Sequence, residues 1–100
     1  MLDNGVFLKV FDKKIERSKI FLKDLKRINF SNDHYSRYVV FLGKLISDEQ
    51  LQPEAKDHPL KGGWKGFREL HISGDLLLVY KVTDDTLYLT RIGSHSQIFG

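Results

Sequence analysis

GFRELHISGDLLLVYKVTDDTLYLTRI, residues 66–92, is the stretch of sequence that decides the fold. It holds three short runs rich in Leu, Val, Ile, Tyr and Thr, at residues 66–72, 76–82 and 86–92. Ser73-Gly74-Asp75 and Asp84-Asp85 separate the runs, and such residues favour tight turns. β-branched and aromatic residues favour strands. The stretch therefore predicts a meander of three antiparallel strands.

The pattern within these runs also predicts which faces are buried. Side chains alternate along a strand, so Leu70 and Ile72 share one face while Glu69 and His71 share the other. Residues 76–80, LLLVY, are apolar at every position, so this strand is expected at the centre of the sheet with both faces covered. Residues 14–17 are expected to add an edge strand.

The residues before this stretch have a helical period. From Ser18, a candidate N-cap, mostly apolar side chains recur at helical spacing as far as Ile28, and Lys and Arg occupy the opposite face. Ser31 begins a second helical pattern that runs to about Ser47. The two helices are expected to form a hairpin. The predicted fold class is α+β, with an N-terminal helical hairpin packed on a small twisted antiparallel sheet.

Composition limits the classes that need considering. A chain of 100 residues with 41% apolar content can close one modest core, so a single domain over residues 1–100 is expected. The chain has no cysteine, which excludes disulfides and thiolate metal sites and agrees with a cytoplasmic location. No apolar run approaches the ~18 residues of a membrane span. A formal charge of +3 favours a polyanionic partner only weakly.

Three of the four histidines fall in the second half of the chain. His58, His71 and His95 lie there with Asp75 and Arg91. Cleavage of a phosphodiester needs a base, an acid and a cation on the phosphate, and these residue types meet that need. The spacing of the histidines matches no compact zinc motif, so no metal is expected. Histidines that are mere bystanders in a basic chain are the competing interpretation.

Several short motifs occur in a fixed order between residues 57 and 99. They are DHPLKGGWKGFR at 57–68, HISGD at 71–75, LLLVY at 76–80, RIGSH at 91–95 and Phe99. In this order and spacing the chain resembles the YafQ-like toxins of the RelE superfamily. One departure is Leu76, which follows Asp75 where members of that group often have Trp. The resemblance covers nearly half of the chain, and the first half agrees only in being helical.

The resemblance implies a RelE-like microbial ribonuclease fold and the toxin of a type II toxin–antitoxin pair. Such a toxin enters the ribosomal A site and cleaves messenger RNA there through the ribose 2′-OH, without a metal or other cofactor. A DinJ-like or RelB-like antitoxin is the implied partner. The catalytic residues carried over are His58, His71, Asp75, Arg91 and His95. The expected substrate-binding residues are Lys61, Trp64, Lys65 and Phe99.

The roles that follow are expectations. His95 is expected to be the acid at the 5′-oxygen, and Arg91 is expected to stabilise the charge of the phosphorane. His71 and Asp75 are expected to act as the general base or as a base-orienting pair. His58 is a second candidate for the base, or a hydrogen-bond donor to the phosphate. Arg91 shares strand parity with Leu87 and Leu89, so a bulge or twist near Gly93 is needed to bring it into the site.

Other classes of function stay open at this point. A ParE-like toxin that inhibits gyrase has a related fold and no nuclease site. A plain RNA- or protein-binding module and, more distantly, a zinc-bound fold are further alternatives. Residues 1–11 precede the first expected strand and are interpreted as an extension or a start-site artefact.

Overall fold

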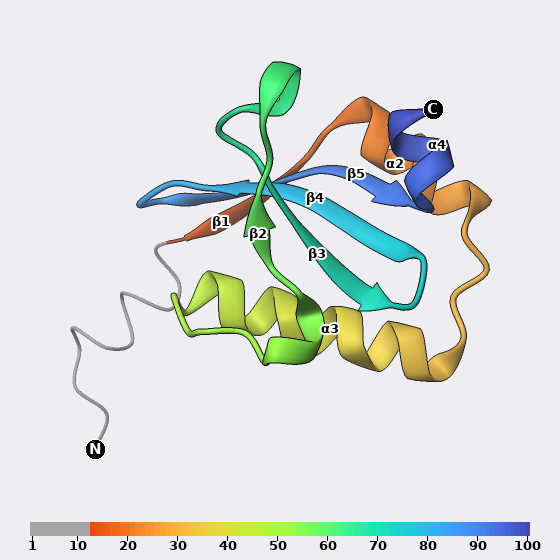
Figure 1. Ribbon diagram of the computed structural model, residues 1–100. Helices are drawn as coiled ribbons and strands as arrows, with labels where there is room; N and C mark the ends of the chain where they lie inside the picture. The colour runs from red at the N-terminus through yellow and green to blue at the C-terminus, as the bar shows by residue number, and fades with distance from the viewer. Residues whose placement is uncertain (1–12) are drawn as a thin grey trace.

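The computed structural model describes residues 13–100, which form a sheet flanked by helices (Figure 1). Residues 1–12 lie outside the described part, and with them the segment interpreted as an extension. Within residues 13–100 the elements are β1 (Lys14–Arg17), α2 (Lys19–Arg27), α3 (Asn32–Ile46), η1 (Pro53–Ala55), β2 (His58–Pro59), η2 (Gly62–Trp64), β3 (Arg68–Ser73), β4 (Leu76–Val82), β5 (Thr86–Gly93) and α4 (His95–Phe99). The α+β class is confirmed.

The strand order in the described sheet is β1-β5-β4-β3-β2. The meander β3-β4-β5 and the central place of β4 are confirmed, and so is the edge strand at residues 14–17. The expectation of a purely antiparallel sheet is wrong, because β1 pairs with β5 in parallel. A local pattern reveals that a strand exists but carries no information on the direction of a partner about 70 residues away.

The segment between α3 and β3 contains the short strand β2. His58 pairs with Glu69 and Pro59 with Arg68 in antiparallel register. Proline cannot donate a ladder hydrogen bond, and it is tolerated here because β2 is an edge strand. Two residues are too few to show a strand pattern in the sequence.

The helix boundaries agree with the capping signals. The Ser18 hydroxyl accepts a hydrogen bond from the backbone N–H of Phe21, and that of Ser31 accepts one from His34. Helix α3 ends at Ile46, with Ser47 as its C-cap. Helix α2 packs beside β5 and α3 packs on β3, so a hairpin in which the helices lie against each other is not confirmed (Figure 1). No helix in this part of the chain is long and apolar enough to cross a membrane.

Both faces of β4 are covered. On one face Leu78 and Tyr80 belong to the main core, together with side chains of α2 and α3. On the other face Leu77 and Val79 form a second, smaller core with Ile98 of α4. This explains why residues 76–80 are apolar at every position. The buried residues of the main core are Phe21, Phe41, Leu45, Ala55, Leu70, Ile72, Leu78, Tyr80, Leu87, Leu89 and Ile92.

Helix α4 was not anticipated from the sequence. Ser94 caps it, and the Gln97 side chain accepts a hydrogen bond from the Ser94 N–H, which completes a capping box. Gly93 before it has φ of 155°, a conformation that L side chains rarely adopt. Because Ile98 is buried in the second core, α4 is fixed on the sheet rather than trailing from it.

Candidate active site

The turn between β3 and β4 joins three of the expected catalytic residues. His71, near the end of β3, has its Nδ1 3.3 Å from the carbonyl oxygen of Gly74 in the turn. Asp75, at the end of the turn, accepts a hydrogen bond from the backbone N–H of His95 at 3.2 Å. The turn therefore ties the strand that carries His71 to the helix that carries His95. Asp75 contacts α4 rather than the ring of His71, which differs from the expected base-orienting pair.

Glu69 lies between His58 and His71. His58 pairs with Glu69 across β2 and β3, and its Nε2 lies 3.1 Å from Glu69 Oε2. His71, two residues further along β3, has its Nε2 3.9 Å from the same oxygen. The side chain of Glu69 is only 8% exposed, and its other oxygen, Oε1, is buried without a partner in the described structure. A buried carboxylate with a free oxygen is costly unless cations or donors face it.

The two histidine rings have different neighbours. His58 Nδ1 lies 2.7 Å from the carbonyl oxygen of Lys56, while its Nε2 faces Glu69. His58 is therefore held at both ring nitrogens. His71 has its Nδ1 near the Gly74 carbonyl, and its Nε2 lies farther from Glu69, at 3.9 Å.

A half-buried carboxylate anchors the strand that carries His58. Asp57 accepts two hydrogen bonds from the Arg68 guanidinium and one from the Tyr80 hydroxyl. The hydrogen bond to Asp57 raises the pKa of Arg68 above its usual value, and burial, followed by the contact with Asp57, raises the pKa of Tyr80. Arg68 and Tyr80 therefore keep their ordinary charge states at neutral pH, and His58 follows Asp57 in the chain.

Arg91 is bound inside the protein on two sides. Its Nε and Nη2 donate to the Asp24 carboxylate of α2 at 2.8 and 3.2 Å. Its Nη2 and Nη1 also donate to the carbonyls of Gln97 and Ile98 at 3.2 and 3.4 Å, near the end of α4. The hydrogen bonds to Asp24 raise the pKa of Arg91. In this conformation Arg91 links α2 to α4, and most of its donors are already used.

A bulge in β5 changes the face of the sheet on which Arg91 lies. Val79 pairs with Arg91 but Tyr80 pairs with Leu89, so Thr90 is the extra residue. The sequence predicted a bulge or twist near Gly93, and the bulge lies three residues before it. Beyond it Ile92 returns to the main core with Leu89, and Arg91 lies between α2 and α4.

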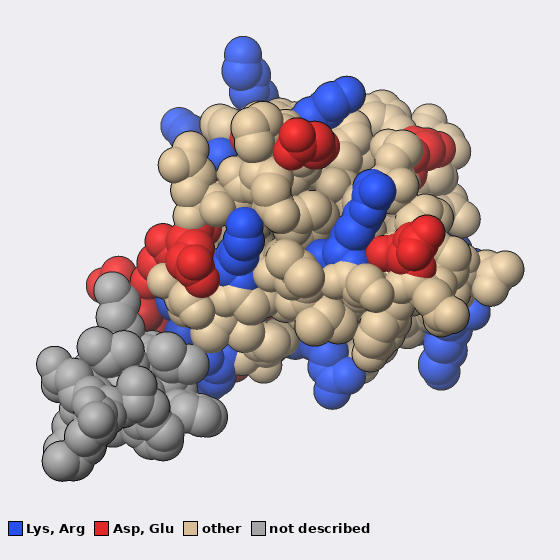
Figure 2. All heavy atoms as spheres, turned by 90° about the horizontal axis from the view of Figure 1, so that it is seen from below, with Lys and Arg blue, Asp and Glu red and all other residues tan. Residues whose placement is uncertain are grey.

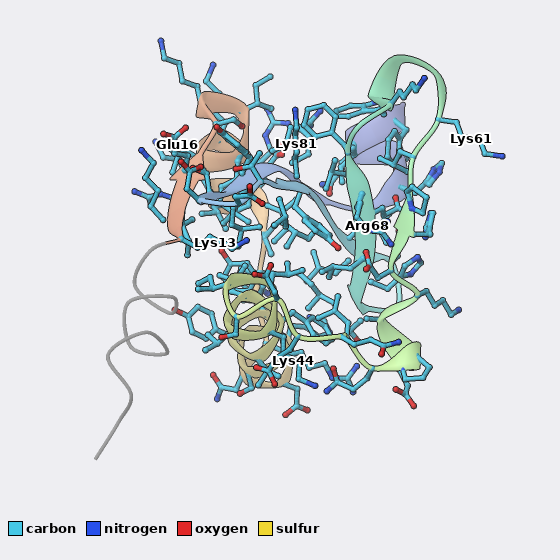
Figure 3. All side chains as sticks on the ribbon, turned by 90° about the vertical axis from the view of Figure 1, so that its left-hand side faces the viewer. Lys13, Glu16, Lys44, Lys61, Arg68 and Lys81 are labelled. Atoms are coloured by element: carbon cyan, nitrogen blue, oxygen red, sulfur yellow. The ribbon has the colours of Figure 1, made fainter. Side chains whose placement is uncertain are left out.

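The expected substrate-binding aromatic residues form a connected row. The ring of Trp64 lies 5.6 Å from that of Phe99 and 5.8 Å from that of Phe67, and the Phe99 ring lies 5.0 Å from His95. Trp64, Phe67 and Phe99 pack on the second core while remaining only partly buried. Lys61 extends from the η2 loop away from the body of the protein, and Lys65 in the same loop is exposed (Figure 3).

Two residues that the sequence did not single out belong to this arrangement. Glu69 could have been suspected, because it shares a strand face with His71 and an acid on a buried sheet is unusual. Asp24 falls among the apolar positions of the α2 pattern and is 5% exposed, which is a comparable signal. Within residues 13–100 no group of three His, Cys, Asp or Glu side chains has the geometry to hold a metal ion.

These features define a class: a small α+β protein that carries histidines on β2, at the end of β3 and at the start of α4. Comparison with known proteins narrows the class to one family. A model of the family described as bacterial toxin of type II toxin–antitoxin system, YafQ, matches residues 13–100. The mRNA interferase toxin YafQ of Escherichia coli K12 is 35% identical over 92 residues, covering 91% of this chain and all of the relative.

Solved structures agree with this match. The metal-bound toxin from Helicobacter pylori is 46% identical with a TM-score of 0.76, covering 87% of this chain and 99% of that one. In the complex of the E. coli toxin YafQ with DinJ, the matching chain is 35% identical with a TM-score of 0.74, covering 89% and 99%. The chain belongs to the YafQ family of toxins of type II toxin–antitoxin systems.

Proposed function

We propose that this chain cleaves messenger RNA in the ribosomal A site by acid–base catalysis through the ribose 2′-OH, without a metal ion. It is an endoribonuclease of the mRNA interferase class, as its curated relatives are named. The observation that carries the mechanism is the β3–β4 turn, which joins His71 to Gly74 and Asp75 to the first backbone N–H of α4. A candidate base and a candidate acid are thereby held on one rigid unit.

We propose the following steps for the reaction. The 2′-OH gives its proton to Nε2 of His71, and the 2′-oxygen attacks the adjacent phosphorus. The bond from phosphorus to the 5′-oxygen breaks, and His95 donates a proton to that oxygen. The products are a 2′,3′-cyclic phosphate and a 5′-hydroxyl. His58 supplies a hydrogen-bond donor to the phosphate. Arg91 keeps α4, and so His95, in place.

The partners follow from the family. The E. coli relative forms a complex with DinJ, and we propose that an antitoxin of the DinJ or RelB kind silences this chain. Figure 2 shows the side of the protein below α3, where basic side chains alternate with acidic ones. A surface of mixed charge steers the chain to ribosomal RNA less strongly than a continuous basic patch does. Binding to the ribosome therefore depends on a limited set of basic residues.

Two alternatives are separated by their chemistry. The E. coli relatives are named as mRNA interferase toxins, which favours this reaction over gyrase inhibition. The H. pylori relative was crystallised with a metal, and the group in this chain nearest to a metal site is His58, Glu69 and His71. Cleavage that continues in EDTA, with ribosomes verified intact, supports the metal-free route. Activity lost in EDTA and restored by Zn²⁺ or Cu²⁺ would overturn it.

The decisive variant is His95→Gln. Glutamine keeps hydrogen-bonding capacity but cannot act as the acid, so single-turnover cleavage of ribosome-bound messenger should fall by about 10²–10⁴-fold. Asp84→Asn is the control, because Asp84 is exposed in the β4–β5 turn, at the opposite end of the strands from the β3–β4 turn. Thermal melts check that both variants fold. If His95→Gln cleaves within threefold of the parent, His95 is not the acid.

A further inference from the structure

A second polar pocket lies beside the β3–β4 turn, on the side of the helices. It is open to solvent and has a volume of about 430 Å³. The connection between α2 and α3 forms one wall, with Arg27, Asn29 and His34. Asp75 and Ser94 stand on the opposite wall. Since Asp75 is hydrogen-bonded to the backbone of His95, the pocket adjoins the start of α4, which carries the proposed acid. We call it the flank pocket.

The polar side chains of the helical wall have no structural task. Among residues 13–100, Arg27, Asn29 and His34 have no side-chain hydrogen bond or ion pair within the protein. Arg27 brings positive charge, and the Asn29 amide offers both donors and an acceptor. Half-buried Ile28 and Leu76 add apolar surface to the same pocket. A cation, an amide, an imidazole and an apolar surface together suit a nucleotide, which has a charged phosphate, hydrogen-bonding edges and a flat base.

We propose that the flank pocket binds one of the two nucleotides that flank the cleaved bond. Arg27 contacts its phosphate, and Asn29 and His34 contact the edge of its base. A free anion is a poorer occupant because the Asp75 carboxylate lines the wall opposite Arg27. The volume lies within the roughly 300–1,000 Å³ of small-ligand pockets. This inference rests on the proposed function and extends the site into the helical half of the chain.

The test measures which nucleotide is preferred, and not only the rate. Ribosomes are programmed with messengers that differ only in the nucleotide on either side of the cleaved bond, and single-turnover cleavage is followed at increasing toxin concentration. The parent should discriminate among the four bases at one of the two positions. Asn29→Ala and His34→Gln should each reduce that discrimination by about threefold to tenfold, as expected for one lost hydrogen bond.

Arg27→Gln should act differently from the two base-contacting variants. It should raise the half-saturating toxin concentration for all four bases and lower the slope of log affinity against log salt by about 0.7, the contribution of one single-strand phosphate contact. Lys23→Gln is the matched control, because Lys23 lies one turn earlier on α2, is exposed and does not line the pocket. Equal effects of Lys23→Gln and Arg27→Gln would reduce the role of Arg27 to general charge and overturn its assignment.

The outcomes also separate this inference from the proposed function. If the parent cleaves and His95→Gln does not, the proposed function stands whatever the flank pocket does. A parent that cleaves all four bases equally at both positions would overturn the inference alone, as would Asn29 and His34 variants that keep the preference of the parent. A parent that leaves messenger intact would overturn both.

Discussion

Asp24→Ala is expected to be the most destabilising single polar change in the described part of the chain. The Asp24 carboxylate accepts three hydrogen bonds: two from Arg91 at 2.8 and 3.2 Å, and one from the backbone N–H of Ile92 at 3.1 Å. β1 pairs with β5 only as far as Leu89, so this carboxylate serves as the partner of the β5 edge beyond β1. Alanine removes all three contacts at once.

The magnitude follows from burial. The side chain of Asp24 is 6% exposed and that of Arg91 is 17% exposed, so solvent screens the pair only weakly. Removing one partner of a buried pair costs about 3–5 kcal/mol. Arg91 keeps its contacts with the carbonyls of Gln97 and Ile98, which places the loss at the lower end, about 3 kcal/mol. For a domain of this size that corresponds to a fall in melting temperature of roughly 12–24 °C.

Urea unfolding and thermal melts measure the loss. Lys23→Ala, an exposed change at the neighbouring position of α2, should stay within about 0.5 kcal/mol of the parent. The double variant Asp24→Leu with Arg91→Met should recover part of the stability, because it removes the unpaired charge as well. A loss below about 1 kcal/mol for Asp24→Ala, or no recovery in the double variant, would refute the reasoning.

Three further predictions concern the frame around the site. Burial raises the pKa of Tyr80 above 10.0, so the stability that this group contributes is fully present below pH ~10. Above that pH the free energy of unfolding should fall by about 1.4 kcal/mol per pH unit. Urea unfolding of Tyr80→Phe should lack this part of the fall at alkaline pH. Gly93→Ala would place a Cβ 2.8 Å from Gln97 Oε1, so the capping box should break, costing about 1–2 kcal/mol in urea unfolding and lowering the cleavage rate; an unchanged melt would contradict this. Charge reversal of Lys26 should weaken ribosome association more at low salt than at high salt, and identical binding across a salt series would make it an ordinary surface residue.

The sequence predicted most of the fold because local signals were sufficient for it. Serine caps mark the starts of α2 and α3, and alternating apolar runs mark β3, β4 and β5. What escaped prediction depends on non-local pairing. The parallel partner of β1 and the two-residue strand β2 have no local signature, since both are defined by strands distant in the chain. Helix α4 has five residues, too few for a periodic pattern.

The candidate site, like the fold, was predicted only in part from the sequence. Motif order identified which histidines belong together, but not the contacts that set their roles. The contact of Glu69 with His58 depends on the pairing of β2 with β3, and the bulge at Thr90 decides where Arg91 lies. Hydrogen-bond partners determine which nitrogen of a histidine carries a proton, and those partners are backbone carbonyls that no side-chain motif encodes.

The two carboxylates nearest the proposed chemistry have opposite tasks, and this explains why the base is expected to be His71 rather than His58. Glu69 is buried and lies 3.1 Å from His58 Nε2, while the other ring nitrogen of His58 lies 2.7 Å from a backbone carbonyl. Asp75 is exposed and binds the backbone N–H of His95, so it fixes the position of α4. His71 Nε2 lies farther from Glu69, at 3.9 Å, and is therefore the less engaged of the two candidate bases. His95, the proposed acid, is held in place by two independent contacts: Asp75 at the start of α4 and Arg91 at its end.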